Sequence, residues 1–189
     1  LSSTPASDVY NAWYLTSITD KNNNKISFTF DSSLRPTGVN LTPNGSSTIS
    51  FLTLAYNSDG HLSMIRNDTS KEAIVFRYSS TYSGSIVTSS TKYLREIVYA
   101  HGSSSVTTAN WTNFYNNANN TTNITVDAKA TYTYDSSGRL DIVTDTLFGY
   151  RIDYTYSSGK VTVIQEYGSK TGSTYTAGQK IGLTYSNGY

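Results

Sequence analysis

The chain has 189 residues, which is enough for one domain with a core of its own. Charged residues make up only 14% and the net charge is +1, so no strong field favours nucleic acid or acidic membranes. Cysteine is absent, which excludes disulfides, thiolate zinc sites and cysteine nucleophiles, and no apolar run reaches the roughly 20 residues of a membrane-spanning helix.

A short pattern of three alternate residues recurs along the chain. Each copy has an apolar residue, an apolar or aromatic residue and a final Tyr or Phe, with one residue between them. The six trios are Ile26/Phe28/Phe30, Leu52/Leu54/Tyr56, Ile74/Phe76/Tyr78, Ala130/Tyr132/Tyr134, Ile152/Tyr154/Tyr156 and Ile181/Leu183/Tyr185. This spacing places each trio on one face of a strand, with Ser, Thr, Asp and Arg on a wetter face. We expect the trios to form a buried core layer; the alternative is an aromatic surface that stacks sugars or peptides.

Turn residues follow the trios. They read Asp31-Ser-Ser-Leu34, Asn57-Ser-Asp-Gly60, Asp135-Ser-Ser-Gly138, Ser157-Ser-Gly159 and Ser186-Asn-Gly188, with a longer form at 79–84. An opening Asp or Asn and a closing Gly with positive φ predict hairpins with a type I turn and a bulge. Leu34 replaces the Gly, so the first turn should differ in conformation. Pro36 predicts that the following strand is an edge strand or is broken.

The regular pattern stops between Val98 and Ala130. We expect a loop insertion at 101–127, with a short helical turn around 109–115. Trp111, Phe114 and Tyr115 would share one face of that helix, which either closes the end of the sheet or contacts a ligand. These three residues and Tyr82 are the candidate ligand contacts. Tyr167 and Tyr175 are further aromatics outside the trios.

One segment carries a family resemblance. The run Tyr132-Thr-Tyr-Asp-Ser-Ser-Gly-Arg-Leu140 resembles the signature of YD repeats, the building unit of RHS proteins. The run Leu54-Ala-Tyr-Asn-Ser-Asp-Gly-His-Leu62 resembles it less closely, and 13–25 running into Phe28-Thr-Phe-Asp31 resembles the segment that links two such repeats. The positions that match the signature are Phe30, Asp31, Tyr56, Gly60, Tyr78, Tyr134, Asp135, Gly138, Arg139, Leu140, Tyr156, Gly159 and Tyr185.

The resemblance implies a bacterial protein that is secreted or displayed on the cell surface. Its repeat residues would be scaffold residues without a catalytic role, and no cofactor is implied. Partners would be other segments of the parent protein, a cargo polypeptide, or surface glycans or proteins. We expect this chain to be a piece of a longer protein whose signal sequence lies elsewhere.

Candidate chemistry is sparse. Histidine occurs only as His61, in a slot that Arg139 and Lys160 fill in other repeats, and as His101, in the predicted insertion. An exposed polar slot is a poor setting for general-base catalysis. The turn 57–60 resembles a calcium loop superficially but lacks the distal carboxylate, which favours an ordinary hairpin turn and no metal.

Three carboxylates, Asp141, Asp145 and Asp153, could pair across a hairpin as in a glycosidase. Their alternation with apolar residues favours a solvated sheet face instead. An enzyme is therefore the least favoured reading, behind a carbohydrate- or peptide-binding module.

We predict one all-β domain over 1–189, an antiparallel meander of about ten to thirteen strands. A sheet of that size should curve strongly, as an open barrel or partial shell. The predicted function is that of a non-catalytic structural segment that acts as a scaffold, shell or adhesion surface.

Overall fold

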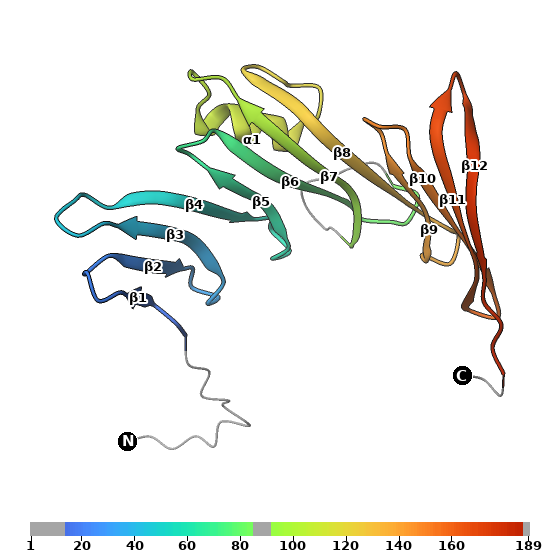
Figure 1. Cartoon of the computed structure of the whole chain (residues 1–189), viewed down its shortest axis with the longest axis horizontal. Coiled ribbons are helices and arrows are strands. Elements are labelled where there is room, and N and C mark those ends of the chain that lie inside the picture. Colours follow the sequence, from blue (N-terminus) through green and yellow to red (C-terminus); the bar gives the residue numbers. More distant parts are fainter. Residues whose placement is uncertain (1–13, 85–91, 187–189) are drawn as a thin grey trace. The chain divides into compact units, whose positions relative to one another are not determined.

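The computed structural model describes residues 14–84 and 92–186. Within these residues, twelve strands and one helix follow each other in sequence (Figure 1). Their bounds are β1 Ser17–Thr19, β2 Lys25–Phe30, β3 Pro36–Thr42, β4 Ile49–Tyr56, β5 Leu62–Asn67, β6 Glu72–Ser79, β7 Tyr93–Gly102, α1 Thr108–Asn116, β8 Ile124–Tyr134, β9 Leu140–Asp145, β10 Arg151–Ser157, β11 Lys160–Thr171 and β12 Thr174–Gly182.

The order of the strands in the sheet is their order in the sequence, and successive strands pair antiparallel from β1 to β3 and from β4 to β12. The predicted all-β antiparallel meander is therefore confirmed. The chain divides into two compact units, 1–51 and 52–189, and the boundary falls within β4. In the larger unit the described strands form an open sheet, because its first and last strands, β4 and β12, do not pair with each other. The expected open barrel and strong curvature are not found in that unit.

A β-bulge lies at the last residue of five trios. The pairing shifts just before the last residue of each of these trios, and the extra residue lies on the partner strand, at Thr37, Ser63, Arg95, Asp141 and Thr162. A bulge leaves one strand with an extra residue, which sharpens the local twist as the chain enters the turn. This confirms the predicted hairpins with a bulge.

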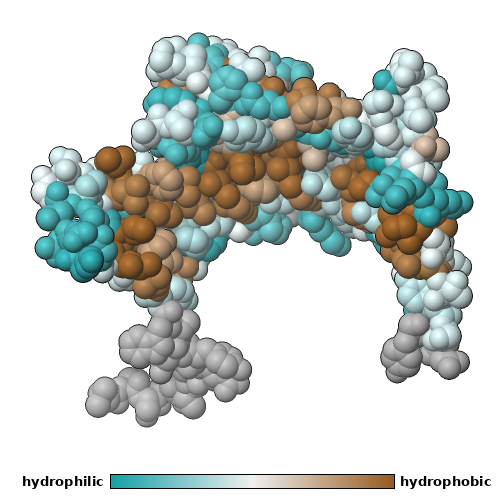
Figure 2. Space-filling model, in the orientation of Figure 1, coloured by the Kyte–Doolittle hydropathy of each residue, from teal (hydrophilic) through white to brown (hydrophobic). Residues whose placement is uncertain are grey.

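The buried core lies on the face opposite the trios, which corrects the prediction that the trios form it. Along β6, Ala73 and Val75 are 2% and 0% exposed, whereas the trio residues Ile74 and Phe76, which alternate with them, are only half-buried. The core consists of Met64, Ala73, Val75, Val98, Ala100, Val106, Trp111, Phe114 and Ile124. Figure 2 shows that apolar residues remain exposed along the larger unit.

The helix α1 covers this core from the insertion. Thr107 caps it: its Oγ1 accepts a hydrogen bond from the Asn110 amide at 3.3 Å, and its own amide donates to Asn110 Oδ1 at 2.8 Å. The helix contacts β6 and β8. Because β7 continues to Gly102 and β8 starts at Ile124, the inserted segment is 103–123 and not 101–127.

Two sequence expectations fall partly outside the described residues, namely Trp13 and residues 187–188 of the last turn. Within the described part of the chain, no helix is long and apolar enough to cross a membrane.

Candidate functional site

Three hairpin turns that follow a trio share one hydrogen-bonding scheme, at 31–35, 57–61 and 135–139, and Asp20 repeats it at 20–24. In the third, Asp135 Oδ1 accepts from the amides of Ser137 and Arg139 at 2.8 and 3.0 Å. Asp135 Oδ2 also lies 2.7 Å from the Arg139 guanidinium. The hydrogen bond from the Arg139 amide is the main cause that holds the pKa of Asp135 below its usual value. At 57–61, the Asn57 amide oxygen accepts from the amides of Asp59 and His61, as in an ordinary hairpin turn.

The first turn repeats this scheme, although Leu34 stands in the glycine position. Asp31 Oδ1 accepts from Ser33 and Arg35, and Leu34 has a φ of 61° beside 84° at Gly60 and 76° at Gly138. The expectation of a different conformation at Leu34 is therefore wrong. Pro36 is the first residue of β3, which continues unbroken to Thr42, so of the two expectations for this strand, an edge or a break, the break is wrong.

Four tyrosines tie each hairpin to the one before it. Tyr78, Tyr134, Tyr156 and Tyr185 donate their hydroxyl hydrogen bonds to the backbone oxygens of Leu62, Leu94, Leu140 and Val161. The distances lie between 2.7 and 2.8 Å. Each acceptor is at the start of the return strand of the preceding hairpin. We call these four residues the inter-hairpin tyrosines.

The residue before each acceptor packs on the ring of the same tyrosine. His61 stacks on Tyr78 at 5.3 Å between ring centroids. The Arg139 guanidinium lies 4.3 Å from the centroid of Tyr156. Tyr93 meets Tyr134 edge-on, and Lys160 lies over Tyr185. The post-turn slot therefore holds a cation or a ring, which explains why its residue type varies while its contact is kept.

Burial raises the pKa of Tyr78, Tyr134 and Tyr156. A raised tyrosine pKa keeps the hydroxyl protonated and therefore able to donate. The repeat-signature residues are thus occupied by contacts that hold the hairpins together.

A buried ion cluster fixes the helix to the sheet. Arg77 is 2% exposed, and its guanidinium donates to the backbone oxygens of Tyr115 and Phe114 and to Glu96 Oε2, at 3.1, 2.5 and 2.9 Å. Glu96 Oε1 also pairs with Lys129 Nζ at 2.5 Å. Sequence reasoning missed this cluster. The signal was available in β6 and β7, where apolar residues occupy both faces and so indicate burial on both sides.

The aromatic residues that are candidate ligand contacts differ in how deeply they are buried. Trp111 and Phe114 are each 1% exposed and meet edge-on in the core, so these two residues, proposed as ligand contacts, pack against the sheet instead. Tyr115 is half-buried beside them, and burial raises its pKa. Tyr82 is 37% exposed in the loop after β6 and stays a candidate.

The three carboxylates of the glycosidase alternative do not converge. Val143 pairs with Ile152, and Ile142 pairs with Asp153. Alternation along the strands therefore places Asp153 on the opposite face of the sheet from Asp145, whereas Asp141 is the extra residue of the bulge between Leu140 and Ile142. Asp153 forms a two-point ion pair with Arg151, and Asp145 accepts two backbone amides in its turn.

His101 lies in β7 and not in a loop. It is half-exposed, and its Nδ1 is 2.7 Å from Asp127 Oδ2. In the neighbouring strand, Glu72 accepts a hydrogen bond from the Tyr99 hydroxyl at 2.6 Å. Across residues 14–84 and 92–186, no three His, Cys, Asp or Glu side chains are placed to hold a metal ion.

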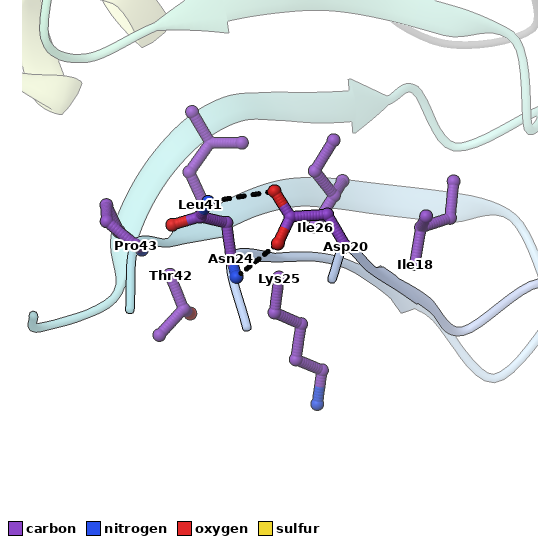
Figure 3. Close-up of a pocket in the computed structure, with 8 residues that line it drawn as sticks. All are labelled: Ile18, Asp20, Asn24, Lys25, Ile26, Leu41, Thr42 and Pro43. Carbon is purple, nitrogen blue, oxygen red and sulfur yellow. Dashed lines mark hydrogen bonds between the residues drawn. The ribbon is translucent and has the colours of Figure 1, made fainter. Parts of the chain in front are cut away.

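Two shallow pockets with an apolar floor lie on the trio face, one in each unit, and a more polar one of about 380 Å³ is lined by Lys160, Thr162, Leu183 and Tyr185. The first has a volume of about 330 Å³ and is formed by Ile18, Ile26, Leu41 and Pro43, with Asp20 and Asn24 beside them. Figure 3 shows the Asp20 carboxylate bonded to Asn24, while Lys25 and Thr42 point the other way. The second has a volume of about 190 Å³ and lies on β5, β6 and β7.

No family model matches the chain, and no curated protein matches it. Among solved structures, the chain is similar to the crystal structure of TcdB2-TccC3 without its hypervariable C-terminal region, at a TM-score of 0.40 and 18% identity. The match covers 91% of this chain and 9% of that chain. The chain therefore spans about a tenth of the length of that protein.

Proposed function

We propose that the chain is a non-catalytic structural segment of a bacterial secreted or cell-surface protein built from YD-type repeats. Its role is that of a scaffold, shell or adhesion surface. Its partners are other segments of the parent protein, a cargo polypeptide, or surface glycans and proteins.

The observation that supports this proposal most is the repeated bond of the inter-hairpin tyrosines. The same donor, the same acceptor position and a side chain packed on the ring recur at four successive hairpins, at Tyr78, Tyr134, Tyr156 and Tyr185. A repeat whose signature side chains bond to the next repeat is built to extend a sheet, because each unit contacts its neighbours. Residues free for chemistry are scarce in such a unit.

The cellular location of the parent protein can be tested with a membrane-impermeant reagent that labels amines. The reagent is added to intact cells that make this protein. Lys21 and Lys25 are exposed, so peptides that contain them should carry the label. A cytosolic protein of the same cells serves as the control and should stay unlabelled. Labelling of Lys21 and Lys25 only after lysis would contradict a secreted or surface-displayed protein.

A carbohydrate- or peptide-binding module is the second candidate, favoured by exposed aromatic side chains. Tyr82, Phe148 and Tyr150 are 37%, 63% and 56% exposed. Exposed rings can stack on sugars, as aromatic residues do at binding surfaces. Binding on a glycan array that Tyr82→Ala or Tyr150→Ala abolishes would support this module, and no binding at millimolar sugar would count against it.

A further inference from the structure

The second pocket combines an apolar floor with a polar rim. Leu52, Ile65, Ile74 and the ring of Tyr99 line it, and Asn67 and Glu72 stand at its edge. Its volume of about 190 Å³ is below the roughly 300–1,000 Å³ of sites for drug-sized molecules. A pocket of this size accommodates one side chain.

The rim carries an ionised carboxylate. Glu72 Oε2 accepts from the Ser70 hydroxyl and Oε1 from the Tyr99 hydroxyl, each at 2.6 Å. These two bonds lower the pKa of Glu72, the one from Ser70 most. Each carboxylate oxygen keeps a further lone pair, so the group can accept another donor.

The residue that lies directly across the sheet from Glu72 is His101. Within the described part of the chain, no lysine or arginine forms an ion pair with Glu72. The nearby His101 is bonded to a second carboxylate, that of Asp127. A cation that enters the pocket would meet Glu72 and the ring of Tyr99, which is 39% exposed.

The same combination occurs a second time, in the unit 1–51. Ile18, Ile26 and Leu41 form the apolar floor there, and the Asp20 carboxylate lies at the rim. Its oxygens accept hydrogen bonds from the amides of Asn22 and Asn24. Figure 3 shows Lys25 pointing away from this floor. An apolar floor beside a carboxylate is therefore present in both units.

We infer that the pocket beside Glu72 binds a lysine or arginine side chain of a partner polypeptide. The alkyl stem would lie against Leu52, Ile65 and Ile74, as such stems do on apolar surfaces. The cation would meet the Glu72 carboxylate and the Tyr99 ring. This inference does not depend on the proposed scaffold function, because it rests on the charge and shape of the pocket alone.

The test is an NMR titration of the whole chain with N-acetyl-lysine amide and N-acetyl-arginine amide. N-acetyl-norleucine amide, which has an apolar stem without the charge, is the matched ligand. The two cationic ligands should shift the amides of Ile65, Ile74 and Tyr99 saturably at millimolar concentration. The norleucine ligand should bind about threefold to tenfold more weakly.

Glu72→Gln should weaken the binding of the two cationic ligands by a similar factor. Glu72→Asp should retain most of the binding because the charge is kept. Glu166→Gln is the matched control, since Glu166 is an exposed carboxylate on the same face, in β11. Unchanged amide shifts in β9, which pairs with neither β6 nor β11, would verify that the variants fold. Equal binding of the norleucine ligand, shifts away from the pocket, or undiminished binding by a folded Glu72→Gln variant would each overturn the inference.

Discussion

The side chain that opens each turn, Asp31, Asn57 or Asp135, determines the local structure of its hairpin. Its oxygen accepts the backbone amides two and four residues later, so it holds the turn from within. Leu34 adopts the same left-handed conformation as the glycines of the other turns. The opening carboxylate therefore imposes the turn even where the residue at the glycine position is strained.

Replacing Leu34 by glycine should stabilise the protein. A left-handed residue other than glycine costs about 1–2 kcal/mol, whereas glycine costs about 0.5–1 kcal/mol through the entropy of the unfolded chain. Because Leu34 is 53% exposed, little burial is lost. We expect the free energy of unfolding, measured in urea, to rise by up to about 1 kcal/mol.

Two matched variants check the cause. Leu147 is 51% exposed and is not among the residues with positive φ, so Leu147→Gly should destabilise the chain. Gly138→Ala should destabilise it by about 1 kcal/mol or more, because φ is 76° and a Cβ atom would lie 2.7 Å from the Tyr93 hydroxyl oxygen. If Leu34→Gly and Leu147→Gly had the same effect, strain at Leu34 would be refuted.

At the scale of the elements, the insertion provides the lid of the core. Trp111 and Phe114 share one face of α1, as their spacing predicts, and Arg77 fastens the end of this helix to β6. The arginine contacts residues that are 19, 37 and 38 positions away in the sequence. Local spacing contains no information about such partners.

Arg77→Ala should lower the free energy of unfolding by about 3–5 kcal/mol, because it removes one member of a buried ion pair and leaves the other. Arg139→Ala is the control. The ion pair of Arg139 with Asp135 is more exposed, so this variant should lose about 1 kcal/mol or less of its free energy of unfolding. The double variant with Glu96→Gln should lose less than the two single losses combined. Equal losses at Arg77 and Arg139 would contradict a buried, helix-fastening role.

Local chemistry also marks the limit of what the sequence predicts. The strands, the bulged hairpins and the helix near 109–115 follow from alternation and turn residues, which act within a few positions. Which face of the sheet is buried does not follow from these local signals, because Ala73 and Val75 become part of the core only where α1 covers them. Without that cover, the larger aromatic trios are the natural expectation for a core.

At the scale of the whole molecule, the inter-hairpin tyrosines make stability depend on pH in the alkaline range. Burial raises the pKa of Tyr78, Tyr134 and Tyr156 above the ordinary value of 10.0. A group whose pKa is raised on folding stabilises the folded state fully below its unfolded pKa, and this contribution is lost as the pH rises through the folded pKa. Stability should therefore fall above about pH 10.

Urea unfolding at a series of alkaline pH values checks this expectation. Phenylalanine at positions 78, 134 and 156 removes the ionisable hydroxyls, so the decline should become shallower. An equally steep decline in that triple variant would place the responsible groups elsewhere.

The most direct test of the tyrosine-linked scaffold is the stability of a variant in which Tyr78, Tyr134, Tyr156 and Tyr185 are all phenylalanine. At about 0.5–1.5 kcal/mol for each hydrogen bond, the free energy of unfolding should fall by about 2–6 kcal/mol. The control carries phenylalanine at Tyr82, Tyr132, Tyr150 and Tyr154, whose hydroxyls form no hydrogen bond within residues 14–84 and 92–186. Urea unfolding followed by the fluorescence of buried Trp111 should show the loss in the first variant and little change in the control. The same midpoint in both variants would contradict the role of these tyrosines in holding the hairpins together.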